Sequence, residues 1–306
     1  MGIASTEKLA PSGSSAAHAV ASVGAQFSAG PPPGKLAPSG GSAAHAVASV
    51  GAILPGFTVE TLPEIDSTNS ELMRRAKSGL TAPVLLVAHH QTAGRGRLGR
   101  TWLDGGKTIT PSVLMFSLGL ELAPANWSGL SLAVGLAVAR NLHPGLRLKW
   151  PNDIWWEERK LGGILIETVA LGGLGNPSKN QAPARYAVIG IGINISARGA
   201  QGLSTAPAWL QELHPGIDAE GALRRIAAPL VDVVKQFEVT GFAPFQTPFN
   251  HLDALDRRAV ALSDGASGVA MGVDELGALR VQSESGMVKI TSSEISVRPQ
   301  MIAKPD

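Results

Sequence analysis

The chain has 306 residues, of which 44% are hydrophobic and 16% are charged, and its formal net charge at pH 7 is +2. This composition is typical of a globular protein of about two domains, and so small a net charge does not call for a broad nucleic-acid-binding surface. The absence of cysteine excludes disulfides, thiolate zinc sites and cysteine nucleophiles, and it is compatible with a reducing compartment. No apolar run approaches the roughly 20 residues of a membrane-spanning helix.

The first 55 residues differ in composition from the rest of the chain. The segment KLAPSGSSAAHAVASVGA (Lys8–Ala25) recurs almost unchanged at Lys35–Ala52, and three prolines followed by a glycine (residues 31–34) lie between the copies. Two near-identical copies indicate a tandem duplication rather than a solenoid. Small, flexible residues predict a disordered, low-complexity tail, and a signal peptide would need a leucine-rich core behind a basic start.

From Phe57 onwards the pattern of apolar residues is typical of a folded protein. Short apolar runs predict strands, and the i, i+3, i+4, i+7 spacing predicts helices. The predicted strands are Val84–His90, Ser112–Leu122, Leu146–Trp150, Leu161–Val169 and Tyr186–Ser196. The predicted helices are Ser70–Leu80, Asn126–Leu142 with Asn126 as its N-cap, and Asp218–Gly241. Short β runs and Gly-containing turns between Asp253 and Arg298 predict a small barrel.

The stretch AGRGRLGRTW (Ala93–Trp102) matches the dinucleotide-binding fingerprint G-x-G-x-x-G at Gly94, Gly96 and Gly99. That fingerprint requires a helix after the loop, and the residues after Gly99 have no helical pattern. The nearby GGKT lacks the first glycine of a P-loop. Arginine binds phosphate and carboxylate oxygens in bidentate fashion, so we interpret this stretch as a loop that folds over an anionic, aromatic ligand such as an adenylate.

The segment KWPNDIWWEERKLGGILIE (Lys149–Glu167) places polar residues at strand ends. Asn152 and Asp153 either stabilise a turn or take part in a site, in which case Asp153 would bind Mg²⁺, a cation that prefers carboxylate oxygens. Lys160 opens an apolar strand, so its side chain points either into a site or out to solvent.

Two further segments have both a structural and a functional interpretation. One hydroxyl of Ser67 or Thr68 is expected to cap the helix that follows, and the same hydroxyls can bind a polar ligand. Gly190 and Gly192 interrupt a strand, which indicates a bulge or the close approach of a ligand.

Taken together and in this order, the segments STN, QTAGRGRLGRTW, KWPNDIWWEERKLGGILIE and VIGIGINIS resemble the biotin protein ligase family over about residues 57–298. The resemblance implies an α+β fold: a central mixed β-sheet flanked by helices, as in class II aminoacyl-tRNA synthetases and biotin ligases, followed by an SH3-like β-barrel. It implies a catalytic biotin- and ATP-binding domain over residues 56–252 and the barrel over residues 253–306, after the tail of residues 1–55.

The implied activity is that of a biotin–[acetyl-CoA-carboxylase] ligase. Biotin and MgATP give biotinyl-5′-adenylate and pyrophosphate, and a lysine of a biotin carboxyl carrier protein then attacks the adenylate and releases AMP. ATP and Mg²⁺ are thus the implied co-substrate and ion, and the carrier domain of acetyl-CoA carboxylase or a related carboxylase is the implied partner. We expect a cytoplasmic monomer or weak homodimer without membrane or nucleic-acid partners. No recognition helix is apparent in residues 1–55, so no transcriptional repressor activity is expected.

The resemblance also implies a role for individual residues. Lys160 is the main catalytic residue, joined by Arg95 and Arg97. The implied biotin-binding residues are Ser67, Thr68, Asn69, Gln91, Gly94, Arg95, Gly96, Arg97, Lys160 and Gly163. The implied nucleotide-binding residues are Arg97, Arg100, Trp102 (over the adenine), Asn152, Gly190, Gly192, Asn194, Glu294 and Arg298, with Asp153 as the magnesium ligand.

Three other functions compete with this one. Lipoate ligases and octanoyl transferases share the catalytic fold, and the Gly/Arg loop favours biotin over their substrates. A ligand-responsive nucleic-acid-binding regulator would require a DNA-binding domain. A non-catalytic biotin-binding module would have no need of Lys160 and the arginines.

Overall fold

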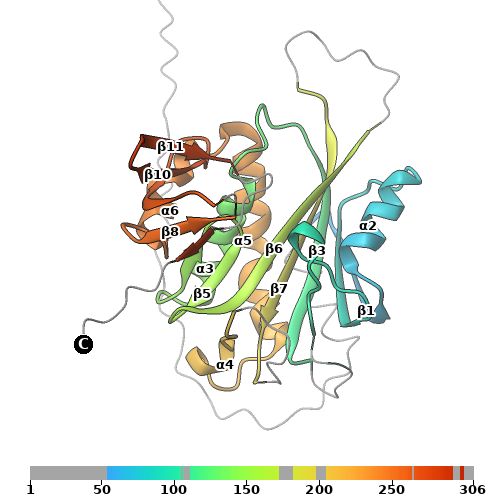
Figure 1. Cartoon of the computed structure of the whole chain (residues 1–306). Coiled ribbons are helices and arrows are strands. Elements are labelled where there is room, and N and C mark those ends of the chain that lie inside the picture. The colour runs from blue at the N-terminus through green and yellow to red at the C-terminus, as the bar shows by residue number, and fades with distance from the viewer. Residues whose placement is uncertain are drawn as a thin grey trace, which may run out of the picture. The chain divides into compact units, whose positions relative to one another are not determined.

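A seven-stranded mixed β-sheet is the largest element of the computed structural model, which describes residues 54–104, 106, 111–171, 182–197, 205–263, 265–291 and 297–299. The strand order is β1-β2-β3-β7-β6-β5-β4, with β1 and β2 parallel and the other neighbours antiparallel (Figure 1). The strands are β1 (Thr58–Ile65), β2 (Val84–Gln91), β3 (Val113–Leu122), β4 (Arg147–Lys149), β5 (Asp153–Trp156), β6 (Arg159–Ala170) and β7 (Arg185–Asn194). The tail predicted over residues 1–55 lies outside the described residues, except for its last two.

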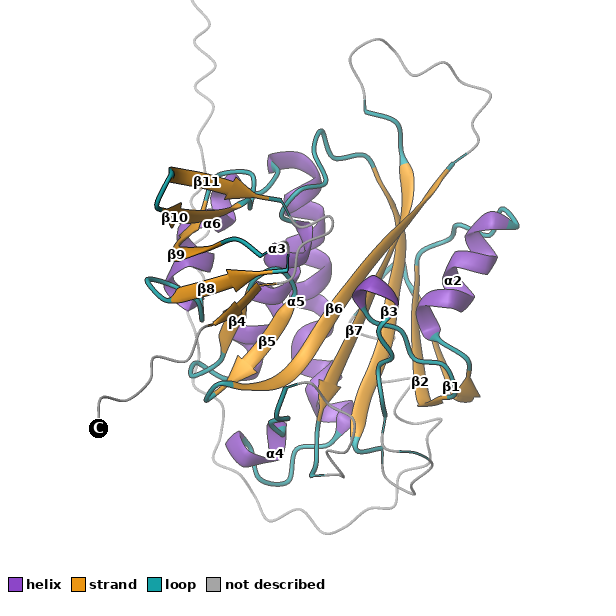
Figure 2. Ribbon diagram, viewed as in Figure 1, coloured by secondary structure: helices purple, strands orange, loops and turns teal. Residues whose placement is uncertain are grey.

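Helices cover the two faces of this sheet unequally (Figure 2). The main hydrophobic core joins one face to α3 (Leu130–Leu142), α5 (Ala219–Thr240) and α6 (Ala243–Leu252). On the other face, a smaller cluster packs α2 (Thr68–Lys77) against Val84, Leu86, Tyr186 and Val188. The remaining helical segments are the short α4 (Leu210–Leu213) and a 3₁₀ turn at Arg97–Gly99.

Strand β7 shows how the sequence separates the two faces. Successive side chains of a strand point to opposite faces, and Ala187, Ile189, Ile191 and Ile193 all belong to the main core. Tyr186 and Val188 point the other way, toward α2. The next positions on that second face are Gly190, Gly192 and Asn194. This face of the sheet therefore loses its large side chains just beyond the part that α2 covers.

A second, five-stranded antiparallel sheet follows α6, with strand order β11-β10-β9-β8-β12. Its strands are β8 (Ala259–Leu262), β9 (Ser267–Val273), β10 (Leu279–Ser283), β11 (Gly286–Ile290) and β12 (Val297–Pro299). The buried indole N–H of Trp150 donates to the carbonyl of Gly277, 3.1 Å away, and so joins the two sheets. The mixed sheet with its helices and this second sheet confirm the predicted α+β fold class.

Helix boundaries test the predictions from periodicity. Helix α5 is confirmed: Asp218 caps it, and its apolar stripe is buried, namely Leu223, Ile226, Ala227, Leu230, Val231, Val234 and Phe237. The predicted start of α3 was wrong. Asn126 instead accepts a hydrogen bond from the N–H of Ser128 in a turn, and the helix begins after Gly129, where φ is +84°. The ring of Phe242 occupies the place where a side chain at Gly129 would lie. Among the described helices, none has both the length and the apolar content needed to cross a bilayer.

Candidate functional site

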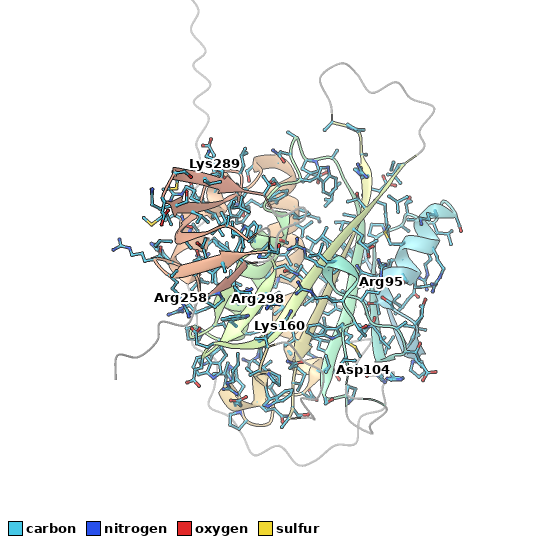
Figure 3. The ribbon with its side chains drawn as sticks, viewed as in Figure 1. Arg95, Asp104, Lys160, Arg258, Lys289 and Arg298 are labelled. Atoms are coloured by element: carbon cyan, nitrogen blue, oxygen red, sulfur yellow. The ribbon has the colours of Figure 1, made fainter. Side chains whose placement is uncertain are left out.

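A cavity of about 810 Å³ lies on the sheet face that carries α2, over β3, β7 and β6. This volume is within the range of small-molecule sites. Figure 3 labels three of its lining residues, Arg95, Lys160 and Arg298, which come from a loop, from β6 and from β12. The predicted site residues that line it are Ser67, Thr68, Asn69, Gln91, Arg95, Gly96, Arg97, Arg100, Trp102, Asn152, Asp153, Lys160, Gly163, Gly190, Gly192, Asn194 and Arg298. Gly94 lies beside them in the loop backbone, and Glu294 is outside the described residues.

One end of the cavity is formed by uncharged hydrogen-bonding groups at the start of α2. Ser67 is the N-cap of that helix, and its hydroxyl accepts a hydrogen bond from the N–H of Ser70 at 3.4 Å. Thr68 donates to the side-chain oxygen of Gln91 through its N–H at 2.7 Å and through its hydroxyl at 3.2 Å. The helix cap expected from the sequence therefore forms, and it also positions hydroxyl groups in the cavity wall.

Behind these groups lies a buried polar network that reaches β6. The hydroxyl of Ser117 lies 2.7 Å from that of Thr68 and 2.6 Å from the side-chain oxygen of Asn69. The Asn69 amide nitrogen donates to the carbonyl of Leu165 at 3.2 Å and to the carboxylate of Glu167 at 3.0 Å. Ser117 and Asn69 are at most 3% exposed. Buried polar groups that are so connected have fixed orientations, which is what recognition of a polar ligand requires.

The glycines of β6 and β7 make room for two side chains. A Cβ at Gly190 would overlap the amide of Asn69, and a Cβ at Gly192 would overlap the indole of Trp102. A Cβ at Gly163 would lie 3.3 Å from that indole and 3.4 Å from the Lys160 side chain. The Trp102 indole N–H is buried and finds no hydrogen-bond partner among the described residues. The close approach expected at Gly190 and Gly192 is thus made by side chains of the protein itself.

The Gly/Arg loop (residues 92–104) folds back on itself over these glycines. The carbonyl of Gly94 accepts a hydrogen bond from the N–H of Trp102 at 2.9 Å, and the N–H of Gly96 donates to the carbonyl of Arg100 at 2.7 Å. No α-helix begins in the described part of the loop, as predicted. At its end, the buried carboxylate of Asp104 accepts from the N–H of Gln91 at 2.8 Å and contacts His90 at 2.5 Å. Both ends of the loop are therefore anchored at the end of β2.

The other end of the cavity gathers basic side chains around one carboxylate. The ammonium of Lys160 lies 2.6 Å from Asp153 and 5.6 Å from the centre of the Trp102 ring. Arg97, Arg100, Lys149 and Arg298 line the same cavity. Burial lowers the pKa of Lys149, an effect that Asp153 partly opposes, and burial also lowers the pKa of Arg97. Positive charges that are held close together and partly desolvated favour an anionic ligand.

Two asparagines predicted to bind nucleotide also hold the backbone of the site. The Asn152 amide donates to the carbonyl of Ile164 at 2.7 Å, and the Asn194 amide donates to that of Lys160 at 3.1 Å. The Asn152 side chain thus binds the backbone of β6 rather than that of its own turn.

The sequence interpretation did not single out three residues of this region: Lys149, Ser117 and Glu167. Lys149 precedes Trp150 in a quoted motif, and a basic residue at a strand end next to Asp153 was a usable signal. Glu167 pairs with Arg95, at 2.7 Å and 3.1 Å, and no local pattern connects two residues so far apart in the sequence. Ser117 is a single polar residue in an otherwise apolar strand, which indicates a buried polar contact.

Comparisons with known proteins agree with this geometry. The profile of the biotin/lipoate A/B protein ligase family matches residues 62–194, and that of the biotin protein ligase C-terminal domain matches residues 259–298. The bifunctional ligase/repressor BirA of Escherichia coli is 33% identical over 255 residues, which cover 80% of this chain and 75% of that protein. The biotin–[acetyl-CoA-carboxylase] ligase of Paracoccus denitrificans is 29% identical, over 76% of this chain and 98% of that protein.

A solved structure extends the likeness to three dimensions. The biotin protein ligase from Aquifex aeolicus in complex with biotin and ATP superposes on this chain with a TM-score of 0.64 at 29% sequence identity. The superposition covers 79% of this chain and 99% of that one.

Proposed function

The chain belongs to the biotin protein ligase family, and we propose that it uses ATP to attach biotin to a lysine of a biotin carrier protein through biotinyl-5′-adenylate. The relative from Aquifex aeolicus binds biotin and ATP, and the relative from Paracoccus denitrificans is a biotin–[acetyl-CoA-carboxylase] ligase. We extend both properties to this chain and propose the carrier domain of acetyl-CoA carboxylase as its partner.

One observation carries this proposal: a single cavity joins an uncharged, hydrogen-bonding end to a strongly basic end. Biotin has a neutral ureido group at one end and a carboxylate at the other. Its ureido group has both donors and an acceptor, which suits the hydroxyl and amide groups around Thr68 and Asn69. Its carboxylate would then point toward Lys160 and the arginines, where the phosphates of ATP would also be attracted.

Adenylation needs positioning and charge neutralisation more than acid–base chemistry. The carboxylate oxygen of biotin attacks the α-phosphorus of ATP, and the bond to the leaving pyrophosphate breaks. We assign to Lys160 the role of holding the carboxylate and the α-phosphate together, because its ammonium is in the cavity beside Trp102. Arg97, Arg100, Lys149 and Arg298 would stabilise the phosphate charge. In the second step, the carrier amine attacks the biotinyl carbonyl and AMP leaves.

Magnesium fits this site as an ion brought in with ATP. No group of three His, Cys, Asp or Glu side chains that could hold a metal occurs within the described residues, whereas the carboxylate of Asp153 lines the cavity. Mg²⁺ is commonly bound by one or two carboxylates together with substrate phosphates. We therefore propose Asp153 as its protein ligand; the bound ion would supply additional charge neutralisation at the phosphates.

The buried polar network also favours biotin over lipoate. The dithiolane ring of lipoate could form none of the hydrogen bonds that the polar groups around Thr68, Asn69 and Gln91 offer to a ligand. A site built to form such bonds rejects an analogue that lacks them by large factors.

ATP–pyrophosphate exchange tests this function. We expect exchange that depends on biotin and that lipoate does not support, and exchange driven by lipoate alone would contradict the assignment. Lys160→Ala is expected to lower exchange by orders of magnitude. Lys289→Ala is the matched control, because Lys289 pairs with Asp274 in the second sheet and is not among the residues that line the cavity. Near-normal exchange in Lys160→Ala would remove that residue from its role.

We further propose that residues 56–252 form the catalytic domain and residues 253–306 a separate barrel domain. We also propose that the protein works in the cytoplasm as a monomer or weak homodimer and does not repress transcription. The last point is open to direct test, because one relative is a bifunctional ligase/repressor. A gel shift at physiological salt is expected to show no binding to operator DNA, and sequence-specific binding would contradict it.

A further inference from the structure

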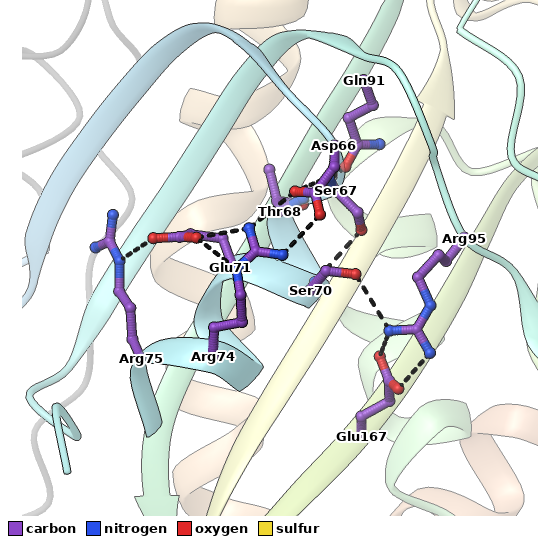
Figure 4. Close-up of polar contacts among 10 residues, drawn as sticks. All are labelled: Asp66, Ser67, Thr68, Ser70, Glu71, Arg74, Arg75, Gln91, Arg95 and Glu167. Atoms are coloured by element: carbon purple, nitrogen blue, oxygen red, sulfur yellow. Dashed lines mark hydrogen bonds and ion pairs between the residues drawn. The ribbon is translucent and has the colours of Figure 1, made fainter. Parts of the chain in front are cut away.

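The carboxylate of Glu167 binds two different parts of the cavity wall at once, and Figure 4 shows one of these contacts, the pair with Arg95. Its Oε1 accepts a hydrogen bond from Arg95 at 2.7 Å, and its Oε2 accepts one from the same guanidinium at 3.1 Å. Oε2 also accepts a hydrogen bond from the amide of Asn69 at 3.0 Å. A third group, the hydroxyl of Ser70 on α2, lies 3.4 Å from the Arg95 guanidinium.

The two partners of Glu167 belong to different functional regions. Arg95 is in the Gly/Arg loop, whereas Asn69 belongs to the uncharged end of the cavity. Glu167 itself stands on β6 opposite Val188 in the register of the central sheet, so its backbone is fixed. A rigid strand thus presents one carboxylate to a loop and to a helix start.

Glu167 and the carbonyl of Leu165 together determine the direction of the Asn69 amide. Both accept hydrogen bonds from the amide nitrogen, so the amide NH₂ faces them and the amide oxygen faces the hydroxyl of Ser117 at 2.6 Å. The hydroxyl of Ser117 lies 2.7 Å from that of Thr68 and so continues the network from Asn69 to Thr68. The carboxylate of Glu167 therefore helps to orient the polar groups at the uncharged end.

We propose that Glu167 is a positioning residue that couples the Gly/Arg loop to the site of the biotin head group. The proposal rests on the function proposed above. When Glu167 holds both Arg95 and Asn69, the closed loop and the oriented polar network stabilise each other. A ligand that seats on the oriented network therefore also favours the closed loop, and a closed loop retains that ligand.

This role differs from that of an ion pair that merely stabilises the fold. The Arg95 side chain is 45% exposed and that of Glu167 is 21% exposed, and pairs as exposed as this one contribute little to stability. Removing the charge of Glu167 should therefore leave the protein folded and change how the loop and the ligand behave. The near-isosteric substitution Glu167→Gln removes the charge and retains the size of the side chain.

The first test is steady-state exchange kinetics with Glu167→Gln, Arg95→Gln and the double variant. We expect Glu167→Gln to raise KM for biotin about threefold to tenfold, with kcat at saturating biotin nearly unchanged. Arg95 itself lines the cavity, so Arg95→Gln is expected to raise KM and to lower kcat as well. In the Arg95→Gln background, the added Glu167→Gln change should raise KM little further, because the coupling between loop and network is already broken. Glu158→Gln is the matched control, because Glu158 pairs with Arg258 through both carboxylate oxygens and does not line the cavity.

A lower kcat with unchanged KM in Glu167→Gln would overturn the proposal, and so would additive effects in the double variant. An unchanged KM would do the same.

The second test needs no enzymatic activity, so it remains decisive even if the wild-type protein shows no biotin-dependent exchange and the proposed function fails. Trypsin cleavage after Arg97 and Arg100 in the ligand-free protein should be about threefold to tenfold faster in Glu167→Gln than in the wild type or Glu158→Gln. Equal cleavage rates in the three proteins would show that Glu167 does not hold the loop. A melting temperature close to that of the wild type shows that faster cleavage comes from the loop.

Discussion

Replacing Gly192 with alanine tests whether Trp102 has to lie against β7 for the site to work. The new methyl group would overlap Cε2, Cζ2 and Nε1 of the indole, which are the three atoms nearest to it. Overpacking of this kind costs about 1–3 kcal/mol. Gly192 is on a central strand with partners on both sides, so the indole will move rather than the backbone.

Moving the indole out of the cavity should impair the reaction by a comparable free energy. We expect kcat/KM for biotin and ATP in the exchange assay to fall about 5- to 150-fold. The control is Gly221→Ala in the first turn of α5, where the nearest atom to a new Cβ is the flexible side chain of Asp218 at 3.1 Å. Wild-type kinetics in Gly192→Ala, in a protein with an unchanged circular dichroism spectrum, would refute the placement of Trp102 over the site.

Three further predictions concern other parts of the molecule. Lys149→Met should raise KM for ATP about tenfold or more and leave the affinity for biotin, measured by calorimetry, nearly unchanged. A larger change in the affinity for biotin than in KM for ATP would contradict our assignment of the basic end to the phosphates. Trp150→Phe leaves the carbonyl of Gly277 buried without its hydrogen-bond donor, so urea denaturation should show a free energy of unfolding lower by about 1–3 kcal/mol. An unchanged free energy of unfolding would mean that this contact does not join the sheets. Burial raises the pKa of the Asp253 carboxyl from 3.8 to about 7, so the folded protein binds the carboxyl proton more tightly than the unfolded chain does. The stability of the wild type therefore falls as pH rises from about 4 to 7. Asp253→Asn should therefore be more stable than the wild type at pH 8, by up to about 4 kcal/mol, and similar near pH 4; equal stabilities at both pH values would argue against the burial of an ionisable carboxyl.

Much of the fold could be predicted because local patterns determine it. The alternation in Tyr186–Asn194 is decisive: apolar residues point to the main core from every odd position, whereas the even positions run from Tyr186 and Val188 through two glycines to Asn194. That pattern identifies both the strand and the face on which the cavity opens. The helical stripe of α5 and its Asp218 cap are equally local.

The contacts that shape the site depend instead on residues far apart in sequence. Nothing near Gly192 indicates that the indole of Trp102 will cover it, and nothing near Arg95 indicates that Glu167 will hold it. The start of α3 was missed for the same reason, since the ring of Phe242 requires a glycine at position 129. Sequence motifs therefore identified about half of the cavity-lining residues, while the partners of those residues required the tertiary structure.

The central claim is that this one cavity activates biotin and passes it to a carrier lysine. The most direct measurement is mass spectrometry of a biotin carrier domain that has been incubated with the protein, biotin and MgATP, beside the same domain with its acceptor lysine changed to arginine. We predict the addition of one biotin to the carrier with the lysine, only when ATP is present, and no addition to the arginine variant. An unmodified carrier, or modification that needs neither ATP nor that lysine, would contradict the claim.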